Sequence, residues 1–291
     1  MANKMNPIKI NSELPLTMLD RNLELNQYDF VLFHLYKEYP EYQEYYKRLR
    51  KTHPDRIMIF DNSAYEFFVK GENLDLEEYA LAVIDLCPDY YILPDKLMDK
   101  KETLMMTFEF LAHHETNIIR AFTNTGKKVP KPLAVAQGNS AKDLFDCLLR
   151  YYGEKIRNVA IPFHNSFFKE EYSPEYANRI RLEFGSLNDD RRYMFGRHQF
   201  ITSAKLLLQA FEYVHLLGSH CPFEKRLYEE VGYDFIKSID TGYPVKCAIA
   251  GYELFKEPTK PDIIIDDFMT VSLSDEQKAL IDININKFKS L

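Results

Sequence analysis

The sequence is poor in cysteine and contains no tryptophan. Its four cysteines, Cys87, Cys147, Cys221 and Cys247, are widely separated among the 291 residues and form no Cys-x-x-Cys pair. This spacing indicates neither a disulfide framework nor a structural zinc cluster. We therefore expect reduced, mostly buried thiols, and we predict no bound metal and no cofactor.

Long apolar runs are also missing. No stretch of about 18 consecutive apolar residues occurs, and the N-terminal segment Met-Ala-Asn-Lys-Met-Asn lacks the apolar core of a secretory signal. We therefore expect a soluble, cytoplasmic protein without membrane contact. The net charge of -7 argues against indiscriminate binding of nucleic acid, although it leaves room for local basic patches.

Hydrophobic residues make up 46% of the chain, which is enough for one large core, and we treat residues 1–291 as one domain. After the first 27 residues, which we interpret as a lead-in rather than a central strand, short apolar segments alternate with helical ones. Seven strands are predicted, at residues 28–35, 56–60, 90–93, 131–136, 158–161, 213–217 and 235–240. Residues 245–250 and 262–265 are the two candidates for an eighth strand.

The segments between these strands have the pattern of helices. They span about 41–51, 76–86 with Asp75 as its N-cap, 101–114, 141–152, 199–211 and 223–231. An Arg-rich excursion at about 165–198 interrupts the alternation. Seven or eight β/α alternations over this length favour an α/β fold of the (β/α)8 TIM-barrel type over an open doubly wound sheet.

Polar residues and one glycine follow the predicted strands where each strand ends, namely Asp61, Asp95, Gln137, His164, Gly218 and Asp240. In a barrel these positions gather around one open end, the mouth, where active sites are built. Two acids at one mouth without a metal-ligand cluster suggest that one attacks an anomeric carbon while the other moves a proton, and Asp61 and Asp240 are the natural pair. The nearby histidines His34, His164, His215 and His220 fit structural roles better than catalytic ones.

In order and local spacing these loops resemble those of the tRNA-guanine transglycosylases. The family's Asp-Ser-Gly-Gly-Phe/Tyr-Gln corresponds to Asp61-Asn62-Ser63-Ala64-Tyr65-Glu66, its Asp after a strand to Pro94-Asp95, and its Val-Gln-Gly to Ala136-Gln137-Gly138. Its Leu-Met-Gly-x-Gly-Thr-Pro is similar to Leu216-Leu217-Gly218-Ser219-His220-Cys221-Pro222, and its nucleophile follows a strand as Asp240 does.

The resemblance implies a base-exchange reaction. Asp240 would be the nucleophile that attacks C1′ of a guanosine, and Asp61 would be the general acid and base. The implied substrate-binding residues are Asp95 and Gln137 at the edge of the base, Tyr65 and Leu217 on its two faces, Gly218 close to it, and Ser63.

The chain departs from the family pattern in three places. It lacks the Cys-x-Cys-x-x-Cys plus His zinc site and the Thr-Arg-Asn-Ala-Arg run that helps hold tRNA, and the Gly-Gly-Leu-Ala-Val-Gly strand becomes Asn158-Val-Ala-Ile-Pro-Phe163. A compact chain without these elements looks like the DpdA group, often phage-encoded, which inserts 7-deazaguanines into DNA. The implied partners are DNA and a free 7-deazaguanine base, and the implied location is the host cytoplasm.

With DNA as substrate, the target guanine must leave the base stack to reach the mouth, and basic residues would contact phosphates. The residues implied in this contact are Lys127, Lys128, Lys131, Arg179, Arg181, Arg191, Arg192 and Arg197. Three alternatives remain open: a transglycosylase that acts on tRNA, a non-catalytic nucleic-acid-binding subunit of such an enzyme, and a barrel hydrolase that removes a base without replacing it.

Overall fold

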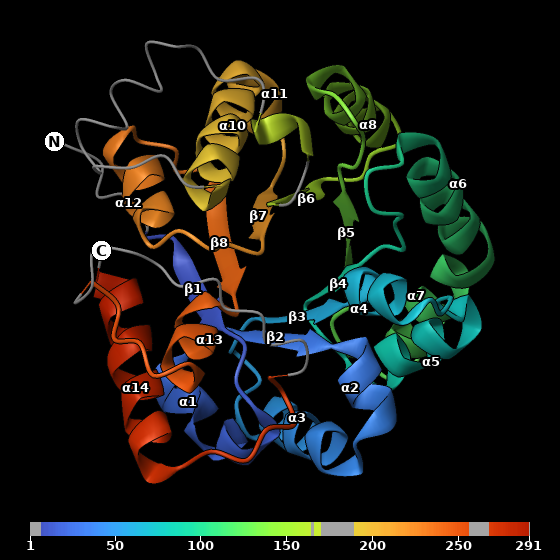
Figure 1. The fold of residues 1–291 in the computed structure, drawn as a ribbon. Coiled ribbons are helices and arrows are strands. Elements are labelled where there is room, and N and C mark those ends of the chain that lie inside the picture. Colours follow the sequence, from blue (N-terminus) through green and yellow to red (C-terminus); the bar gives the residue numbers. More distant parts are fainter. Residues whose placement is uncertain (1–6, 164–165, 170–188, 256–267, 291) are drawn as a thin grey trace, which may run out of the picture.

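The computed structural model describes residues 7–163, 166–169, 189–255 and 268–290. Eight parallel strands form one sheet in the order β1-β8-β7-β6-β5-β4-β3-β2, and helices surround it (Figure 1). The strands are β1 (Lys9–Ser12), β2 (Asp29–Leu32), β3 (Met58–Asp61), β4 (Tyr90–Ile92), β5 (Lys131–Val135), β6 (Asn158–Pro162), β7 (Tyr213–Leu217) and β8 (Ile236–Thr241). The sheet curves into a nearly closed α/β TIM barrel, which confirms the predicted fold class.

All seven predicted strands are present, and the largest difference in length is in β2. This strand ends at Leu32 because Phe33 begins helix α2 (Phe33–Glu38). The Phe33 ring packs against the rings of Phe60 and Tyr79, with centroids 6.0 and 5.1 Å apart. The aromatic residues of this segment predicted a longer strand, but Phe33 packs in a helix instead. Tertiary contacts here override β-propensity.

The eighth strand, β1, lies within the first 27 residues, for which the sequence predicts a lead-in rather than a central strand. It pairs with β8 in parallel and places Asn11 opposite Asp240. That interpretation was wrong, because Ile10 is the one apolar residue of β1 and Pro7 and Pro15 flank the strand, so no apolar run marks it. Of the two candidates for an eighth strand, residues 245–250 fall almost entirely in helix α13 (Tyr243–Ile249), and residues 262–265 lie outside the described part of the chain.

The predicted helices are found, with two changes in length. The helix expected at 101–114 continues from α6 (Lys100–Phe110) through a π-helical turn (Leu111–Glu115) into α7 (Thr116–Thr123). The helix expected at 199–211 begins earlier, as α10 (Asp189–Ser203), and continues as α11 (Lys205–Leu208). The other helices are α1 (Asn22–Leu25), α3 (Pro40–Thr52), α4 (Ala64–Lys70), α5 (Leu76–Leu86), α8 (Ala141–Gly153), α12 (Phe223–Glu230) and α14 (Asp275–Ser290), with 3-10 turns at Leu16–Arg21 and Ser166–Lys169.

Two local predictions are confirmed. Asp75 caps α5, since its carboxylate accepts hydrogen bonds from the backbone N–H groups of Glu77 and Glu78 at 3.0 Å each. The four cysteines are free thiols, of which Cys87 is partly exposed and the other three are buried.

Across the described ranges, none of the helices combines the length and the apolar character that a membrane crossing requires.

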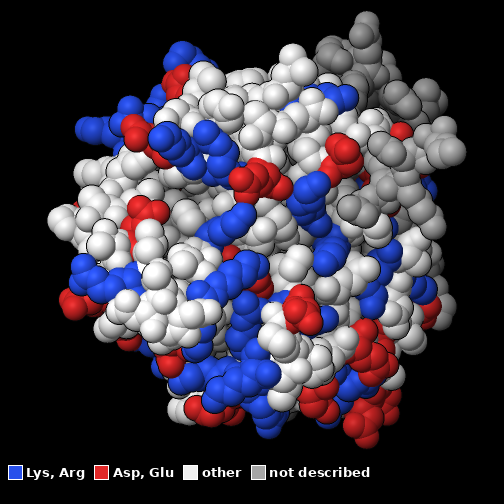
Figure 2. Space-filling model, turned by 180° about the vertical axis from the view of Figure 1, so that it is seen from behind, with Lys and Arg blue, Asp and Glu red and all other residues white. Residues whose placement is uncertain are grey.

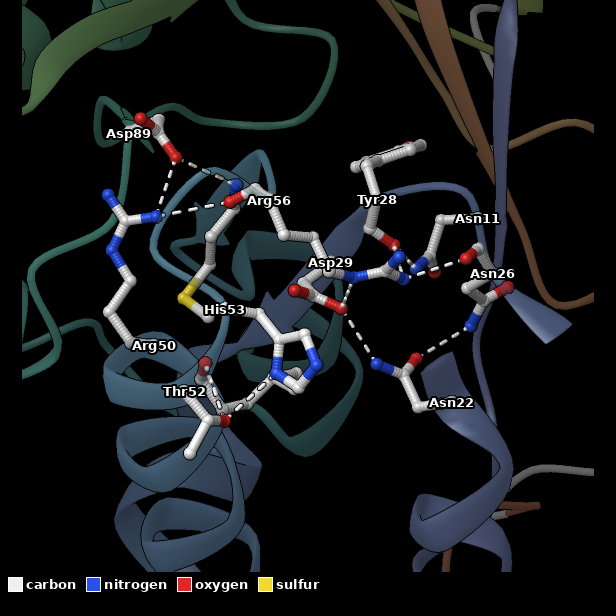
Figure 3. A network of polar contacts seen from close by, with 12 residues as sticks. Asn11, Asn22, Asn26, Tyr28, Asp29, Arg50, Thr52, His53, Arg56 and Asp89 are labelled. Carbon is white, nitrogen blue, oxygen red and sulfur yellow. Dashed lines mark hydrogen bonds and ion pairs between the residues drawn. The ribbon is translucent and has the colours of Figure 1, made fainter. Parts of the chain in front are cut away.

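Strands β1 and β2 lie at the two ends of the sheet, and side-chain amides bridge the seam between them. The Asn26 amide accepts from the backbone N–H of Ser12 at 2.6 Å and donates to the Ser12 carbonyl at 2.9 Å. It also donates to Asn22 at 2.8 Å, while Asn11 donates to the Tyr28 carbonyl at 2.8 Å (Figure 3). These amides satisfy backbone groups that a regular strand ladder would otherwise pair.

Candidate active site at the mouth of the barrel

Figure 1 looks onto the mouth, the end at which the strands terminate. Asp61 is the last residue of β3, and Asp240 is the last but one of β8. Gly218 follows β7 directly, while Asp95 and Gln137 lie two or three residues beyond the ends of β4 and β5. The structure thus brings these five predicted residues to one end of the barrel.

The carboxylate of Asp240 is buried, with its side chain 5% exposed, and both of its oxygens are held. The backbone N–H of Gly218 lies 3.0 Å from Oδ1 and 3.0 Å from Oδ2. His215 Nε2, on β7, lies 3.0 Å from Oδ1. Oδ1 therefore has two polar neighbours, whereas Oδ2 has only its share of the Gly218 N–H among the hydrogen bonds described and retains capacity for a further contact.

Asp61, the other acid of the predicted pair, has a strongly raised pKa. Burial raises its pKa well above the usual range of a carboxyl, and the negative charge of Glu66 raises it further, with smaller effects from Asp95 and Asp240. The backbone N–H of Ser63 opposes this shift by donating to Asp61 Oδ2 at 2.7 Å. A carboxyl with a raised pKa keeps its proton at higher pH and can serve as a general acid.

Ser63, which is predicted to bind substrate, contacts both His34 and Asp61. Its side chain is buried, its backbone is left-handed with φ 59°, and its hydroxyl accepts from the His34 N–H at 3.1 Å. The same hydroxyl lies 3.0 Å from His34 Nδ1. The hydroxyl thus contacts His34, the backbone N–H of Ser63 orients Asp61, and a contact of Ser63 with substrate stays a prediction.

A buried cluster of one carboxylate and two amides surrounds Asp95. Its Oδ1 accepts from Asn62 Nδ2 and its Oδ2 from Gln137 Nε2, both at 2.8 Å. Gln137 Oε1 in turn accepts from the backbone N–H of Met98 at 3.1 Å. Burial raises the pKa of Asp95, and the two amide donors oppose that shift. Sequence reasoning missed Asn62, although it stands in a matched motif.

Two further carboxyls, Glu13 and Glu66, interact electrostatically with the site. Burial raises the pKa of Glu13 to about 8, and the charges of Asp240 and Glu66 contribute, while Lys246 opposes the shift. Burial also raises the pKa of Glu66. Glu13 directly follows β1 and was missed together with that strand, whereas Glu66 stands in a matched motif. Among the described residues, no group of three or more His, Cys, Asp or Glu side chains is placed to hold a metal ion.

The two residues predicted to face the base differ in exposure. Tyr65, on α4, is 58% exposed, so its ring is available to stack on a base. Leu217, the last residue of β7, is half-buried, and its carbonyl accepts from Arg197 at 2.9 Å. The arrangement of both side chains around one base stays a prediction.

Arg197 is fully buried, so the prediction that it contacts phosphate was wrong. Its Nε and Nη2 donate to the two carboxylate oxygens of Glu224 at 2.8 and 2.6 Å, and both side chains are 0% exposed. The guanidinium also donates to the carbonyls of Leu217 and Gly218 at 2.9 Å each. Arg197 therefore holds the loop that presents the Gly218 N–H to Asp240.

The three lysines that are predicted to contact phosphate lie at the end of the barrel opposite the mouth. Lys131 begins β5, Lys127 and Lys128 precede it, and Lys128 binds Asp89, which precedes β4, at 2.7 Å. Figure 2 shows this end, where Lys and Arg side chains are interspersed with Asp and Glu. These lysines therefore do not lie beside Asp240, and their contact with phosphate stays a prediction.

The other basic residues remain predictions. Arg192, on α10, is partly buried. The side chains of Arg179, Arg181 and Arg191, like His164, lie outside what the structure describes. No statement about phosphate contact follows for them.

No family model and no curated protein matches this sequence. Among the solved structures, KGPDC from Streptococcus mutans is similar to this chain, with a TM-score of 0.45, 10% sequence identity and coverage of 99% of each chain. A similarity at this level carries no argument about function. A functional proposal therefore depends on the residues at the mouth and on their resemblance to known motifs.

Proposed function

We propose that the chain is a base-exchange glycosyltransferase that replaces guanine in DNA with a 7-deazaguanine derivative. The observation that carries this proposal is that two aspartates lie at the mouth in different electrostatic environments. Asp61 has a pKa raised by burial and neighbouring acids, whereas the carboxylate of Asp240 accepts from the Gly218 N–H and contacts His215 Nε2. Such a difference in environment suits one acid for proton transfer and the other for nucleophilic attack.

The first half of the proposed reaction removes the original base. Asp240 Oδ2 attacks C1′ of the nucleoside while the bond from C1′ to N9 breaks, and the bonding electron pair stays with the departing guanine. Asp61 donates the proton that neutralises this base. The product of this step is a glycosyl ester on Asp240.

The second half runs the same steps with a different base. The incoming 7-deazaguanine transfers its N9 proton to Asp61, N9 attacks C1′, and the carboxylate of Asp240 leaves. The exchange therefore consumes no net proton or electron and needs no redox cofactor.

Recognition of the base is assigned to the cluster around Asp95. The amides of Asn62 and Gln137 fix this carboxylate, and each of its oxygens can accept one more hydrogen bond from the N–H edge of a guanine. Gly218 adopts a left-handed φ of 59°, which favours glycine, although a Cβ there would meet only Phe163 at 3.8 Å. The backbone conformation, rather than a lack of space, thus accounts for the glycine.

The choice of DNA as the polymer comes from the resemblance to the DpdA group and from the missing tRNA-holding run after Asp240. A guanine in duplex DNA would have to flip out of the stack to reach Asp240. The same resemblance supports the host cytoplasm as the location.

The proposal is tested with DNA and, separately, tRNA that carry labelled guanine, each with and without a free 7-deazaguanine. The expected result is release of label from DNA that depends on the added base and is lost in Asp240→Asn. Release from tRNA alone would replace DNA by tRNA as the polymer. Release without added base, with alkali-sensitive strand breaks, would indicate a hydrolase, and no release from either polymer would refute base exchange.

A further inference from the structure

A line of hydrogen-bonded side chains runs through the interior of the barrel and ends at Asp240. His215 Nε2 lies 3.0 Å from Asp240 Oδ1, and His215 Nδ1 lies 2.7 Å from Ser238 Oγ. Ser238 Oγ in turn lies 2.8 Å from the hydroxyl of Tyr213. His215 and Ser238 are 0% exposed, so water does not compete for these contacts.

The hydrogen-bonding capacities of these side chains determine which of their atoms carry the protons. An ionised Asp240 only accepts hydrogen bonds, so His215 Nε2 carries a proton and donates it to Oδ1. Nδ1 of the neutral ring then accepts from the Ser238 hydroxyl, and the Ser238 oxygen accepts from the Tyr213 hydroxyl. Each donor has an acceptor in this arrangement, in which the acceptor-only carboxylate of Asp240 selects the tautomer of His215 and Ser238 donates to the remaining ring nitrogen.

The plane of the His215 ring is fixed by aromatic neighbours on β2 and just before it. Phe30 stacks on the ring with centroids 5.5 Å apart and planes 29° apart. Tyr28 meets the ring edge-on at 6.2 Å and 84°. A ring held in this way can direct its Nε2–H along one line only, and that line ends at Asp240 Oδ1.

We propose that His215 is a positioning residue for Asp240. Its Nε2–H holds Oδ1, together with the Gly218 N–H, so that Oδ2 is the oxygen presented to C1′. The inference rests on the proposed function and names the residue that orients its nucleophile.

Ser238, His215 and Asp240 are the residue types of a hydrolytic triad, but their placement argues against that chemistry. Ser238 is 0% exposed, and its hydroxyl is engaged by both His215 and Tyr213. Asp240, near the end of β8, is the member that reaches the mouth. The line therefore serves a carboxylate nucleophile and not a serine nucleophile.

The test compares two substitutions of His215 in the base-exchange reaction. His215→Phe keeps the ring and removes the donor, so we expect kcat to fall about 100-fold while KM changes little, since a hydrogen bond to a charged group is lost at the reacting centre only. His215→Gln carries an amide N–H that can reach Oδ1, so we expect kcat within about tenfold of the wild type. An unchanged kcat in His215→Phe, or equal losses in both variants, would overturn the inference.

A matched control is His198→Phe, which replaces another buried histidine whose ring stacks on Tyr233 with centroids 6.0 Å apart. We expect its kcat to stay within about twofold of the wild type, because substitutions away from the reacting groups have small effects. A loss equal to that of His215→Phe would mean that the effect is one of packing and would also overturn the inference.

A second measurement separates this inference from the proposed function. Long-range 1H–15N spectra of protein labelled on histidine distinguish the two tautomers without any substrate. We expect the Nε2–H form for His215, retained in Ser238→Ala with a shifted Nδ1 resonance because this nitrogen loses the hydroxyl that donates to it. An Nδ1–H form would overturn the inference even if base exchange occurs, whereas an Nε2–H form in a protein that exchanges no base would refute the proposed function alone.

Discussion

The peptide group between Leu217 and Gly218 links Arg197 to Asp240. Arg197 donates to its carbonyl at 2.9 Å, and its N–H lies 3.0 Å from each oxygen of the Asp240 carboxylate. A positive charge at the carbonyl end polarises the peptide group and strengthens the N–H as a donor. A buried ion pair, whose arginine the sequence analysis assigned to phosphate contact, therefore supports the carboxylate that we propose as the nucleophile.

The first prediction concerns that ion pair. Arg197→Met leaves the carboxylate of Glu224 buried without its cation, and we expect a loss of about 3 to 5 kcal/mol in the free energy of unfolding. The double variant Arg197→Met with Glu224→Leu removes both charges and should recover part of this loss, although base exchange stays impaired because the loop of Gly218 loses its support. Urea unfolding and the exchange rate measure the two effects.

The control is the exposed pair of Arg150 and Glu154 on α8, whose side chains are 58% and 46% exposed. Arg150→Met should change the free energy of unfolding by less than about 1 kcal/mol, since exposed pairs contribute little. Equal losses in Arg150→Met and Arg197→Met would contradict the role given to the buried pair.

The second prediction concerns the pH dependence of the reaction. The proposed acid is the protonated form of Asp61, whose pKa is raised, so kcat/KM should fall as the pH rises through that pKa. Asp61→Asn cannot donate the proton, and we expect a rate at least about 100-fold lower at neutral pH together with loss of this alkaline limb. A series of kcat/KM values against pH for both proteins provides the measurement. An alkaline limb that survives in Asp61→Asn would assign the proton transfer to another group.

The third prediction concerns Glu13 and the pH dependence of stability. Its pKa is raised from 4.5 to about 8 in the folded chain, so between these values the folded state keeps a proton that the unfolded state has lost. The stability from this group is fully present below pH 4.5 and is lost as the pH rises to about 8. Glu13→Gln cannot titrate, so its free energy of unfolding should fall less over this range. Urea unfolding at several pH values measures the difference, and parallel curves for the two proteins would contradict the prediction.

Topology explains why much of the fold and of the mouth could be predicted. Apolar segments bounded by Gly, Pro and polar residues indicated seven of the eight strands, and parallel strands in a barrel end on one rim. The positions of Asp61, Asp95, Gln137 and Asp240 follow from that rule without any knowledge of their contacts. Strand β1 was missed because three of its four residues are polar, and Glu13 was missed with it.

The errors have different physical origins. Arg197 pairs with Glu224, which is 27 residues away in the sequence, and no local pattern shows that a charged side chain will be buried by a distant partner. The lysines around residue 128 are a different case, because Lys131 begins a strand and strand starts lie at the end opposite the mouth. The sequence contained that signal, so the place of these lysines away from Asp240 could have been predicted.

The fourth prediction concerns the seam between β1 and β2, where Asn26 binds both the N–H and the carbonyl of Ser12. Asn26→Ala leaves these buried backbone groups without partners, and we expect a loss of about 2 to 4 kcal/mol in the free energy of unfolding. The exposed residue Asn124 provides the control, since Asn124→Ala should change stability by less than about 0.5 kcal/mol. Hydrogen exchange at the β1 amides gives a local readout: the Ser12 amide should exchange faster in Asn26→Ala, and unchanged protection there would show that β8 alone holds this strand.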